Sequence, residues 1–268
     1  MASRDGGPVL GLDHITLAVA ALDAAIAVYG TLFAQGCEAR GAAEDLDWAR
    51  FGLANTALVL VAPRGAASPL ARHVAHRPDG AGAALGALAF AVAEPEGAAR
   101  LLERRGLPAA GPALPWQGGE ATPLRPDAAR GLHLLLTRPG AAAASATRLD
   151  HAVIRSGDPE RTIALLAGRL GLELRLDRSN PAWGQRLLFF RCGDLVVEVS
   201  HDLAGGITDA PDSLWGLTWR VPDVGATHAR LEAAGVPVSP LRIGRKPGTR
   251  LFTIRDHAAG VPTAFIGA

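Results

Sequence analysis

The chain repeats itself at two fixed offsets. The triplet Leu12-Asp13-His14 recurs as Leu149-Asp150-His151, 137 residues later. A second offset of 129 residues aligns residues 87–92 with 216–221, and it also aligns Gly106 with Gly235. The first quarter therefore matches the third, and the second quarter matches the fourth. Self-similarity of this kind predicts an architecture built from repeated supersecondary units.

A low-complexity segment separates the two halves. Residues 139–146 read PGAAAASA, and small residues of this kind are typical of a linker. The chain has 268 residues, of which 49% are hydrophobic, so each half is long enough for a core of its own. We therefore expect two domains, at residues 9–139 and 147–268.

The residue pattern of each quarter predicts the same order of elements, namely a strand, a helix and then about three strands. Glycines end two of the helices, at Gly106 and Gly235, as expected for left-handed C-caps. Period-two patterns and short apolar runs predict strands at residues 14–19, 57–62, 88–92, 132–137, 151–155, 187–191, 195–200, 217–221, 251–254 and 263–266. The fold class is therefore α+β, with four βαβββ units.

Composition excludes several classes of function. A net charge of +1 argues against a nucleic-acid binder, which needs a concentrated basic face. No run approaches the roughly 20 apolar residues of a membrane span, and residues 1–8 do not read as a signal peptide, so we expect a cytoplasmic protein. Cys37 and Cys192 are too few and too far apart for a disulfide framework or a zinc cluster.

The repeated LDH triplets, and the DxxxG pattern of Asp256 to Gly260 before the last strand, resemble the vicinal oxygen chelate superfamily. This superfamily includes glyoxalase I, bleomycin-resistance proteins and extradiol dioxygenases, and the resemblance spans nearly the whole chain. It implies two tandem glyoxalase-like half-open barrels, each with a cup that holds a ligand. One such scaffold supports many chemistries, so the function has to be argued from the site.

The resemblance also implies where a metal would bind. Metal enzymes of the family take ligands from the first and last strands of the units, commonly two His and one or two Glu. In the C-terminal cup His151 and Glu198 occupy two of these positions, but Gly216 and Ala264 occupy the others. In the N-terminal cup only His14 remains, and the matching positions are Val59, Ala87 and Leu135. The N-terminal cup is therefore expected to be degenerate.

A divalent metal (Fe, Mn, Zn or Ni) is thus expected only if a substitute ligand completes the set, since such an ion needs about three protein ligands and an open position. His133, His201 and His257 are the candidates. The alternative is that His14 and His151 have a structural role, with a hydrogen-bonded imidazole and no metal.

Strand alternation makes the C-terminal cup the candidate site. Arg155 should share a face with His151, and Thr218 should share one with Arg220. A carboxylate beside imidazole and guanidinium groups is typical of functional sites. We expect Glu198 or His151 to act as the general base, while Arg155 or Arg220 stabilises a developing oxyanion. The alternative is an internal ion pair of Glu198 with one of these arginines.

The segment from Arg242 to Arg250 concentrates four cations before the last strands. We expect it to be a flexible lip in which Lys246 and Arg250 bind an anionic group of the ligand, with a solvated surface loop as the alternative. Three tryptophans, Trp183, Trp215 and Trp219, could line the cup or fill the core.

Two classes of function follow. The first is an enzyme of the glyoxalase or dioxygenase type, a lyase, isomerase or ring-cleaving oxygenase acting on a small oxygen-rich, anionic molecule. The second is a non-catalytic protein that binds and sequesters a small molecule, as bleomycin-resistance relatives do. Four linked units need no partner chain to complete a barrel, so a monomer or a homodimer is expected.

Overall fold

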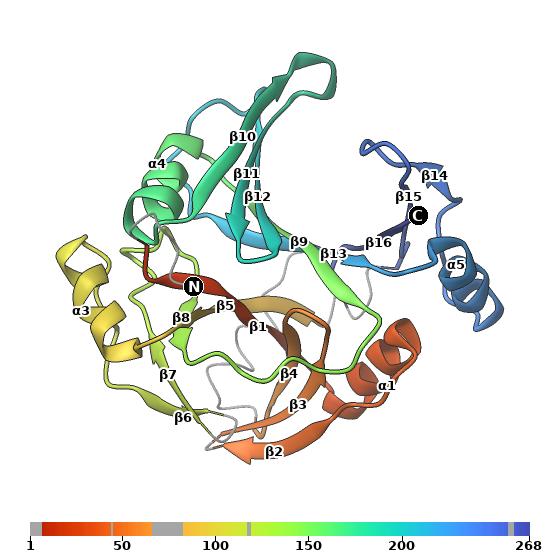
Figure 1. The fold of residues 1–268 in the computed structure, drawn as a ribbon, viewed down its shortest axis with the longest axis horizontal. Helices are drawn as coiled ribbons and strands as arrows, with labels where there is room; N and C mark the ends of the chain where they lie inside the picture. The colour runs from red at the N-terminus through yellow and green to blue at the C-terminus, as the bar shows by residue number, and fades with distance from the viewer. Residues whose placement is uncertain (1–6, 44, 66–82, 117–118, 257–259) are drawn as a thin grey trace. The chain divides into compact units, whose positions relative to one another are not determined.

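The computed structural model describes residues 7–43, 45–65, 83–116, 119–256 and 260–268. The first half forms two βαβββ units (Figure 1). The first unit consists of β1 (Val9–Val19), α1 (Leu22–Phe33), β2 (Ala39–Ala43), β3 (Leu46–Gly52) and β4 (Ala57–Pro63). The second consists of β5 (Ala83–Val92), α3 (Pro95–Arg104), β6 (Leu114–Trp116), β7 (Gly119–Pro123) and β8 (Leu134–Thr137).

The second half repeats this order. The third unit consists of β9 (Arg148–Arg155), α4 (Pro159–Ile163), the π-helix η1 (Ala164–Arg169), β10 (Glu173–Asn180), the 3-10 turn η2 (Pro181–Trp183), β11 (Gln185–Cys192) and β12 (Leu195–Asp202). The fourth consists of β13 (Ser213–Arg220), α5 (Val224–Ala233), β14 (Arg242–Ile243), β15 (Arg250–Thr253) and β16 (Thr263–Gly267). The expected α+β class with four repeated units is confirmed.

The described strands form two mixed sheets of eight strands. Their orders are β2-β3-β4-β1-β5-β8-β7-β6 and β10-β11-β12-β9-β13-β16-β15-β14. The same positions are occupied in both sheets, as the sequence repeat requires. Parallel pairing occurs between β12 and β9, between β13 and β16, and between β5 and β8, whereas the hairpins within each unit are antiparallel.

The chain also divides into two compact units that group the repeats differently from chain order. One contains residues 87–141 and 151–215, which are the second and third repeats, together with the chain up to residue 14; we call it the middle unit. The other contains residues 15–86, 142–150 and 216–268, which are the first and fourth repeats; we call it the end unit. The expected domains, residues 9–139 and 147–268, stay a prediction.

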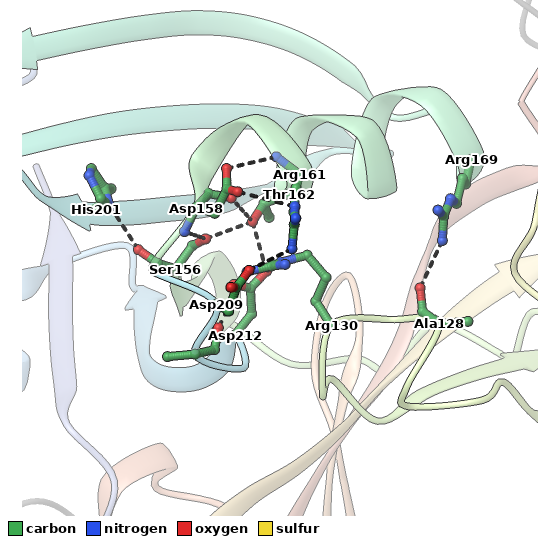
Figure 2. Close-up of polar contacts among 11 residues, drawn as sticks. Ala128, Arg130, Ser156, Asp158, Arg161, Thr162, Arg169, His201, Asp209 and Asp212 are labelled. Atoms are coloured by element: carbon green, nitrogen blue, oxygen red, sulfur yellow. Dashed lines mark hydrogen bonds and ion pairs between the residues drawn. The ribbon is translucent and has the colours of Figure 1, made fainter. Parts of the chain in front are cut away.

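In the middle unit, helices of the two repeats are tied by arginines that donate to backbone carbonyls. Arg105, just after α3, donates from Nη1 to the carbonyl of Arg169 at 2.9 Å. Arg169, at the end of η1, donates in return to the carbonyl of Gly106 at 3.1 Å. It also donates to the carbonyl of Ala128 at 2.8 Å (Figure 2). Arg169 and Gly106 lie at or just after helix C-termini, where carbonyls lack partners within the helix, so the contacts to these two carbonyls join the repeats at a point where the backbone needs donors.

In the end unit, aromatic side chains hold the first and fourth repeats together. Phe33 of α1 packs edge to face on Trp219 of β13, with ring centroids 5.0 Å apart, and it also contacts Phe51 of β3. Trp219 is fully buried, and it is therefore a core residue. Arg230 of α5 donates to the carbonyls of Thr31 at 2.6 Å and Leu32 at 2.8 Å.

Several sequence expectations hold in detail. Gly106 and Gly235 both follow a helix with φ 76°, which confirms the two glycine C-caps. The ten predicted strands are all present, with bounds that differ by up to five residues. Strands β2, β3, β6, β7, β10 and β14 agree with the expected three strands after each helix, but their positions were not predicted, because their residues do not form a regular apolar alternation.

The described helices and the two cysteines add two further findings. Within the described ranges, no helix combines the length and the apolar character that a transmembrane segment needs. Cys37 and Cys192 are both free thiols, as expected. Burial raises the pKa of Cys192 to about 12, so this thiol is a core residue and not a nucleophile.

Candidate functional site

Two neighbouring strands of the middle unit bring His151 and Glu198 together. Strand β12 runs parallel to β9, with Val196 opposite His151 and Glu198 opposite Val153. His151 Nε2 lies 3.7 Å from Glu198 Oε2. The two side chains are 23% and 16% exposed, so both are partly accessible from the surface. The two residues predicted to act as acid and base therefore lie side by side, and their catalytic role stays a prediction.

Alternation along β12 explains why Glu198 is accessible. Leu195, Val197 and Val199 are buried, whereas Val196, Glu198 and Ser200 are only half-buried. One side of the strand therefore belongs to the core, and the other side carries the glutamate. We call this second side of β9, β11 and β12 the His151 face; it carries His151, Glu198 and Arg155.

The surroundings of the pair are largely apolar. Phe189 of β11 lies opposite Glu198 and is half-buried, and Val153 of β9 is 7% exposed. The next row of the same face is polar, because Ser200 Oγ donates to Gln185 Oε1 at 2.6 Å. An ionisable pair on an apolar floor, with polar groups on one side, is a common arrangement in small-molecule sites.

Arg155 adds a cation that stacks on an aromatic ring. Its Cζ lies 4.3 Å from the ring centroid of Trp215, the third residue of β13. Both side chains are exposed, with Trp215 at 38%. Among the described residues, Arg155 has no ion-pair or hydrogen-bond partner. Stacking leaves the N–H edges of a guanidinium available, so Arg155 is oriented but can still bind an anion.

The remaining predicted ligand-binding residues belong to the end unit. Thr218 of β13 is 9% exposed. Arg220 donates from Nε to Asp150 Oδ2 at 2.7 Å, so its ion pair is made with Asp150. Lys246 and Arg250 are exposed. Their role in binding stays a prediction.

The segment expected to form a flexible lip has paired strand residues at both ends, and its flexibility stays a prediction. Within it, Arg242 pairs with Leu251, and Ile243 pairs with Arg250, as strands β14 and β15. The turn between them is held by Thr249, whose backbone N–H and side-chain hydroxyl both donate to the carbonyl of Lys246. The segment therefore joins two short paired strands through residues 244–249, and local hydrogen bonds of the threonine hold part of this connection.

The described residues do not form a ligand set for a divalent metal. They contain no group of three or more His, Cys, Asp and Glu side chains that could hold an ion. His201, one candidate for completing the set, lies three residues after Glu198 and so on the opposite face of β12, where its Nδ1 is 3.0 Å from the carbonyl of Ser156. His133 is exposed, and His257 lies outside the described residues. His151 and Glu198 supply two donors of about three required.

The first repeat differs at the matching position. His14 is 1% exposed, and its Nδ1 lies 2.7 Å from Asp13 Oδ2. This hydrogen-bonded imidazole agrees with the structural alternative for His14. In the third repeat the matching aspartate, Asp150, binds Arg220 instead. The two LDH triplets therefore share a sequence but differ in their contacts.

A buried polar network on the other side of β9 and β12 was not predicted from the sequence (Figure 2). Asp212, just before β13, has a fully buried side chain. Its Oδ2 accepts a hydrogen bond from Thr162 Oγ1 of α4 at 2.7 Å and another from Arg130 Nε at 3.3 Å. Thr162 Oγ1 in turn lies 2.7 Å from Ser156 Oγ, just after β9. Burial raises the pKa of Asp212, although the hydrogen bonds from its three partners oppose this shift.

Only one sequence signal marks this network. Asp158 caps α4, and Thr162 follows four residues later; the same spacing recurs as Asp223 and Thr227 at the start of α5. Both threonines donate to the carbonyl of the capping aspartate, at 3.1 Å and 2.7 Å. The repeat thus predicts the local cap but not the third partner, Asp212.

Trp183 and Trp215 differ from Trp219. Trp183, in η2, is 42% exposed, and Arg178 Cζ lies 5.5 Å from its ring centroid. Trp183 and Trp215 are therefore surface residues that stack with arginines. Trp219 is the core filler that was considered as the alternative for all three.

Comparison with known proteins gives a family match to the second half of the chain. Residues 148–265 match the family model of the Glyoxalase/Bleomycin resistance protein/Dioxygenase superfamily. No curated protein matches the sequence. The matched range contains both His151 and Glu198.

Solved structures match over both halves. A mutant of 4-hydroxymandelate synthase from Streptomyces coelicolor is similar with a TM-score of 0.74 and 14% identity, over 97% of this chain and 93% of the other. An Mn(II)-bound glyoxalase from Novosphingobium aromaticivorans has a TM-score of 0.68 and 14% identity, over 98% and 83%. A halotolerant catechol dioxygenase has a TM-score of 0.67 and 12% identity, over 97% and 87%. At such low identity, these likenesses show a shared fold.

Proposed function

Because residues 148–265 match the model of the Glyoxalase/Bleomycin resistance protein/Dioxygenase superfamily, we propose that the chain binds a small oxygen-rich anion at the His151 face and acts on it as an enzyme. The reaction would be that of a lyase or an isomerase in the cytoplasm, or that of a ring-cleaving dioxygenase if a further ligand completes a metal site. The observation that carries the proposal is the 3.7 Å pair of His151 and Glu198, accessible on an apolar floor.

Each side chain of the His151 face has a distinct role in this proposal. Glu198 or His151 removes a proton from a carbon next to a carbonyl group, and the other member of the pair stabilises the charge that results. Arg155 binds the carboxylate of the substrate or the developing oxyanion. Arg155 lies opposite Ser200, two residues along from Glu198. Two residues of strand span about 6.6 Å, so the acidic carbon and the anionic group should be separated by a similar distance.

Proton abstraction can be tested before the product is known. The protein is incubated in D₂O with a panel of small 2-oxo carboxylates, and exchange of the hydrogen next to the carbonyl is followed by proton NMR. We expect exchange with at least one member of the panel. Glu198→Gln should abolish this exchange but retain binding, because the amide keeps the shape and loses the base.

A second candidate function is a non-catalytic binder. The exposed Arg155–Trp215 stack supports it, since a stacked guanidinium binds anions without chemistry. In that case no panel member would exchange, and Glu198→Gln would change only the affinity. Arg155→Lys would weaken binding under either function, so it serves as the control for ligand recognition.

The metal requirement is tested independently. Elemental analysis is carried out on protein purified without chelator and without nickel affinity resin, beside His151→Ala. With two donors among the described residues, we expect well under one equivalent of Fe, Mn, Zn or Ni. About one equivalent, lost in His151→Ala, would show that a further residue completes the set, and would move the proposal to a metal-dependent lyase or dioxygenase.

A further inference from the structure

We propose that Thr162 and Asp212 are positioning residues for Arg155. In this inference the buried network of Ser156, Thr162 and Asp212 fixes the start of β13 against the end of β9, and so keeps Arg155 stacked on Trp215. The inference rests on the proposed function, in which Arg155 is the anion-binding group of the His151 face.

The network connects to both members of the stack through the chain itself. Ser156 directly follows Arg155, the last residue of β9. Asp212 directly precedes β13, and Trp215 is the third residue of that strand. Thr162 lies between them, with its Oγ1 2.7 Å from Ser156 Oγ and 2.7 Å from Asp212 Oδ2 (Figure 2). One hydroxyl therefore joins the two segments that carry the guanidinium and the indole.

The segment before Asp212 is anchored at further points. The backbone N–H of Asp212 donates to the carbonyl of Arg130 at 2.7 Å, and the N–H of Thr208 donates to the carbonyl of Gly157 at 2.9 Å. Arg161 of α4 donates to Asp209 Oδ1 at 2.9 Å (Figure 2). Within the described middle unit, the connection from β12 to β13 is thus held to the same turn that follows Arg155.

Burying the polar groups of this network costs desolvation free energy, which argues against a purely structural role. The side chains of Thr162 and Asp212 are fully buried, and Asp212 Oδ1 has no hydrogen-bond partner among the described residues. An apolar contact would hold two segments together with less desolvation. Directional hydrogen bonds instead specify the relative position of β9 and β13, as orienting a side chain requires.

The stack can be observed directly by NMR. Arginine side chains are labelled with ¹³C, and the Arg155 Hδ resonances are assigned from their loss in Arg155→Lys. A ring below the guanidinium shifts these resonances upfield, and Trp215→Leu gives their position without the ring. We expect Asp212→Ala and Thr162→Val to move them at least halfway to the Trp215→Leu position.

Two variants serve as matched controls. Asp212→Asn keeps an acceptor for the Thr162 hydroxyl, so it should retain most of the upfield shift. Thr227→Val removes the equivalent hydroxyl of the fourth repeat, which bonds only to the carbonyl of Asp223 among the described residues, and it should leave Arg155 unchanged. The inference is wrong if folded Thr162→Val keeps the wild-type Arg155 resonances; this milder variant decides if Asp212→Ala does not fold.

Benzoate, used as the anionic probe, separates this inference from the proposed function. It should shift the Arg155 resonances saturably in the wild type, and this response should be lost in Thr162→Val. If the stack depends on Thr162 but benzoate and the 2-oxo carboxylates leave Arg155 unaffected, the positioning role stands as geometry and the proposed function fails. If the anions bind and the stack is independent of Thr162, only the positioning role fails.

Discussion

The hydroxyl of Thr162 provides the sharpest test of how the middle unit is held together. Thr162→Val replaces this buried hydroxyl with a methyl group of similar size. Asp212 then loses its 2.7 Å hydrogen bond from Thr162 and keeps the 3.3 Å contact from Arg130, while Ser156 loses one partner. A buried carboxyl that loses its partner costs about 1–3 kcal/mol, and the weakened serine adds about 0.5–1.5 kcal/mol. We therefore expect the free energy of unfolding to fall by about 1.5–4.5 kcal/mol.

Equilibrium urea unfolding, followed by tryptophan fluorescence and far-UV circular dichroism, measures this loss. The control is Thr227→Val, which removes one hydrogen bond to Asp223 on a half-buried helix and should cost about 0.5–1 kcal/mol. Both variants replace threonine with valine near the start of a helix, so the difference in helix propensity between the two residues cancels when the variants are compared. An unchanged m-value would assign the change to the folded state. Equal losses in the two variants would refute the energetic account of the network.

Three further perturbations have defined outcomes. Because burial raises the pKa of Asp212, the folded protein binds the carboxyl proton of Asp212 more tightly than the unfolded chain does. The stability that this protonation contributes is fully present below the ordinary pKa of about 3.9 and is lost as pH rises through the raised pKa. The stability of the wild type relative to Asp212→Asn should therefore fall toward neutral pH in urea titrations. Gly131→Ala places a Cβ 2.6 Å from Pro211 Cβ at φ 89°, so Tm should fall, by an amount equivalent to about 1–3 kcal/mol, in differential scanning calorimetry. Arg230→Ala removes two donors from the last turn of α1 and should cost about 1–2 kcal/mol in urea unfolding, whereas an exposed arginine such as Arg104 should cost almost nothing.

Part of the candidate site could be predicted because it depends on strand parity. His151 and Glu198 lie on adjacent parallel strands, and alternation along β12 decides that residue 198 faces away from the core. The same parity explains why His201 lies on the opposite face, although its nearness in sequence made it a candidate metal ligand. The partners of the arginines could not be predicted in this way. Arg220 binds Asp150, and Arg155 stacks on Trp215, because side-chain conformation and neighbouring strands decide between several partners within reach.

The buried network was missed for a related reason. Arg130, Ser156, Thr162 and Asp212 are spread over more than eighty residues, and no pattern of spacing links them. Local rules predict a helix cap at Asp158 and a threonine hydroxyl four residues later, but they do not predict what else that hydroxyl contacts. The unusual feature of Asp212 is complete burial of a carboxyl, which exists only once distant segments have packed.

The sequence by itself determined the number, order and type of the repeated units, because a pattern that recurs at a fixed offset imposes the same local structure on each copy. It also determined the glycine caps at Gly106 and Gly235, since a left-handed residue after a helix is a local requirement. Only the tertiary structure decided which repeats share a compact unit, with the second packed against the third and the first against the fourth. Periodicity reveals that a helix or strand has an apolar face, but any apolar face can cover any other. The choice is made by specific contacts, such as Phe33 on Trp219 and Arg169 on Ala128, that form between residues distant in the chain.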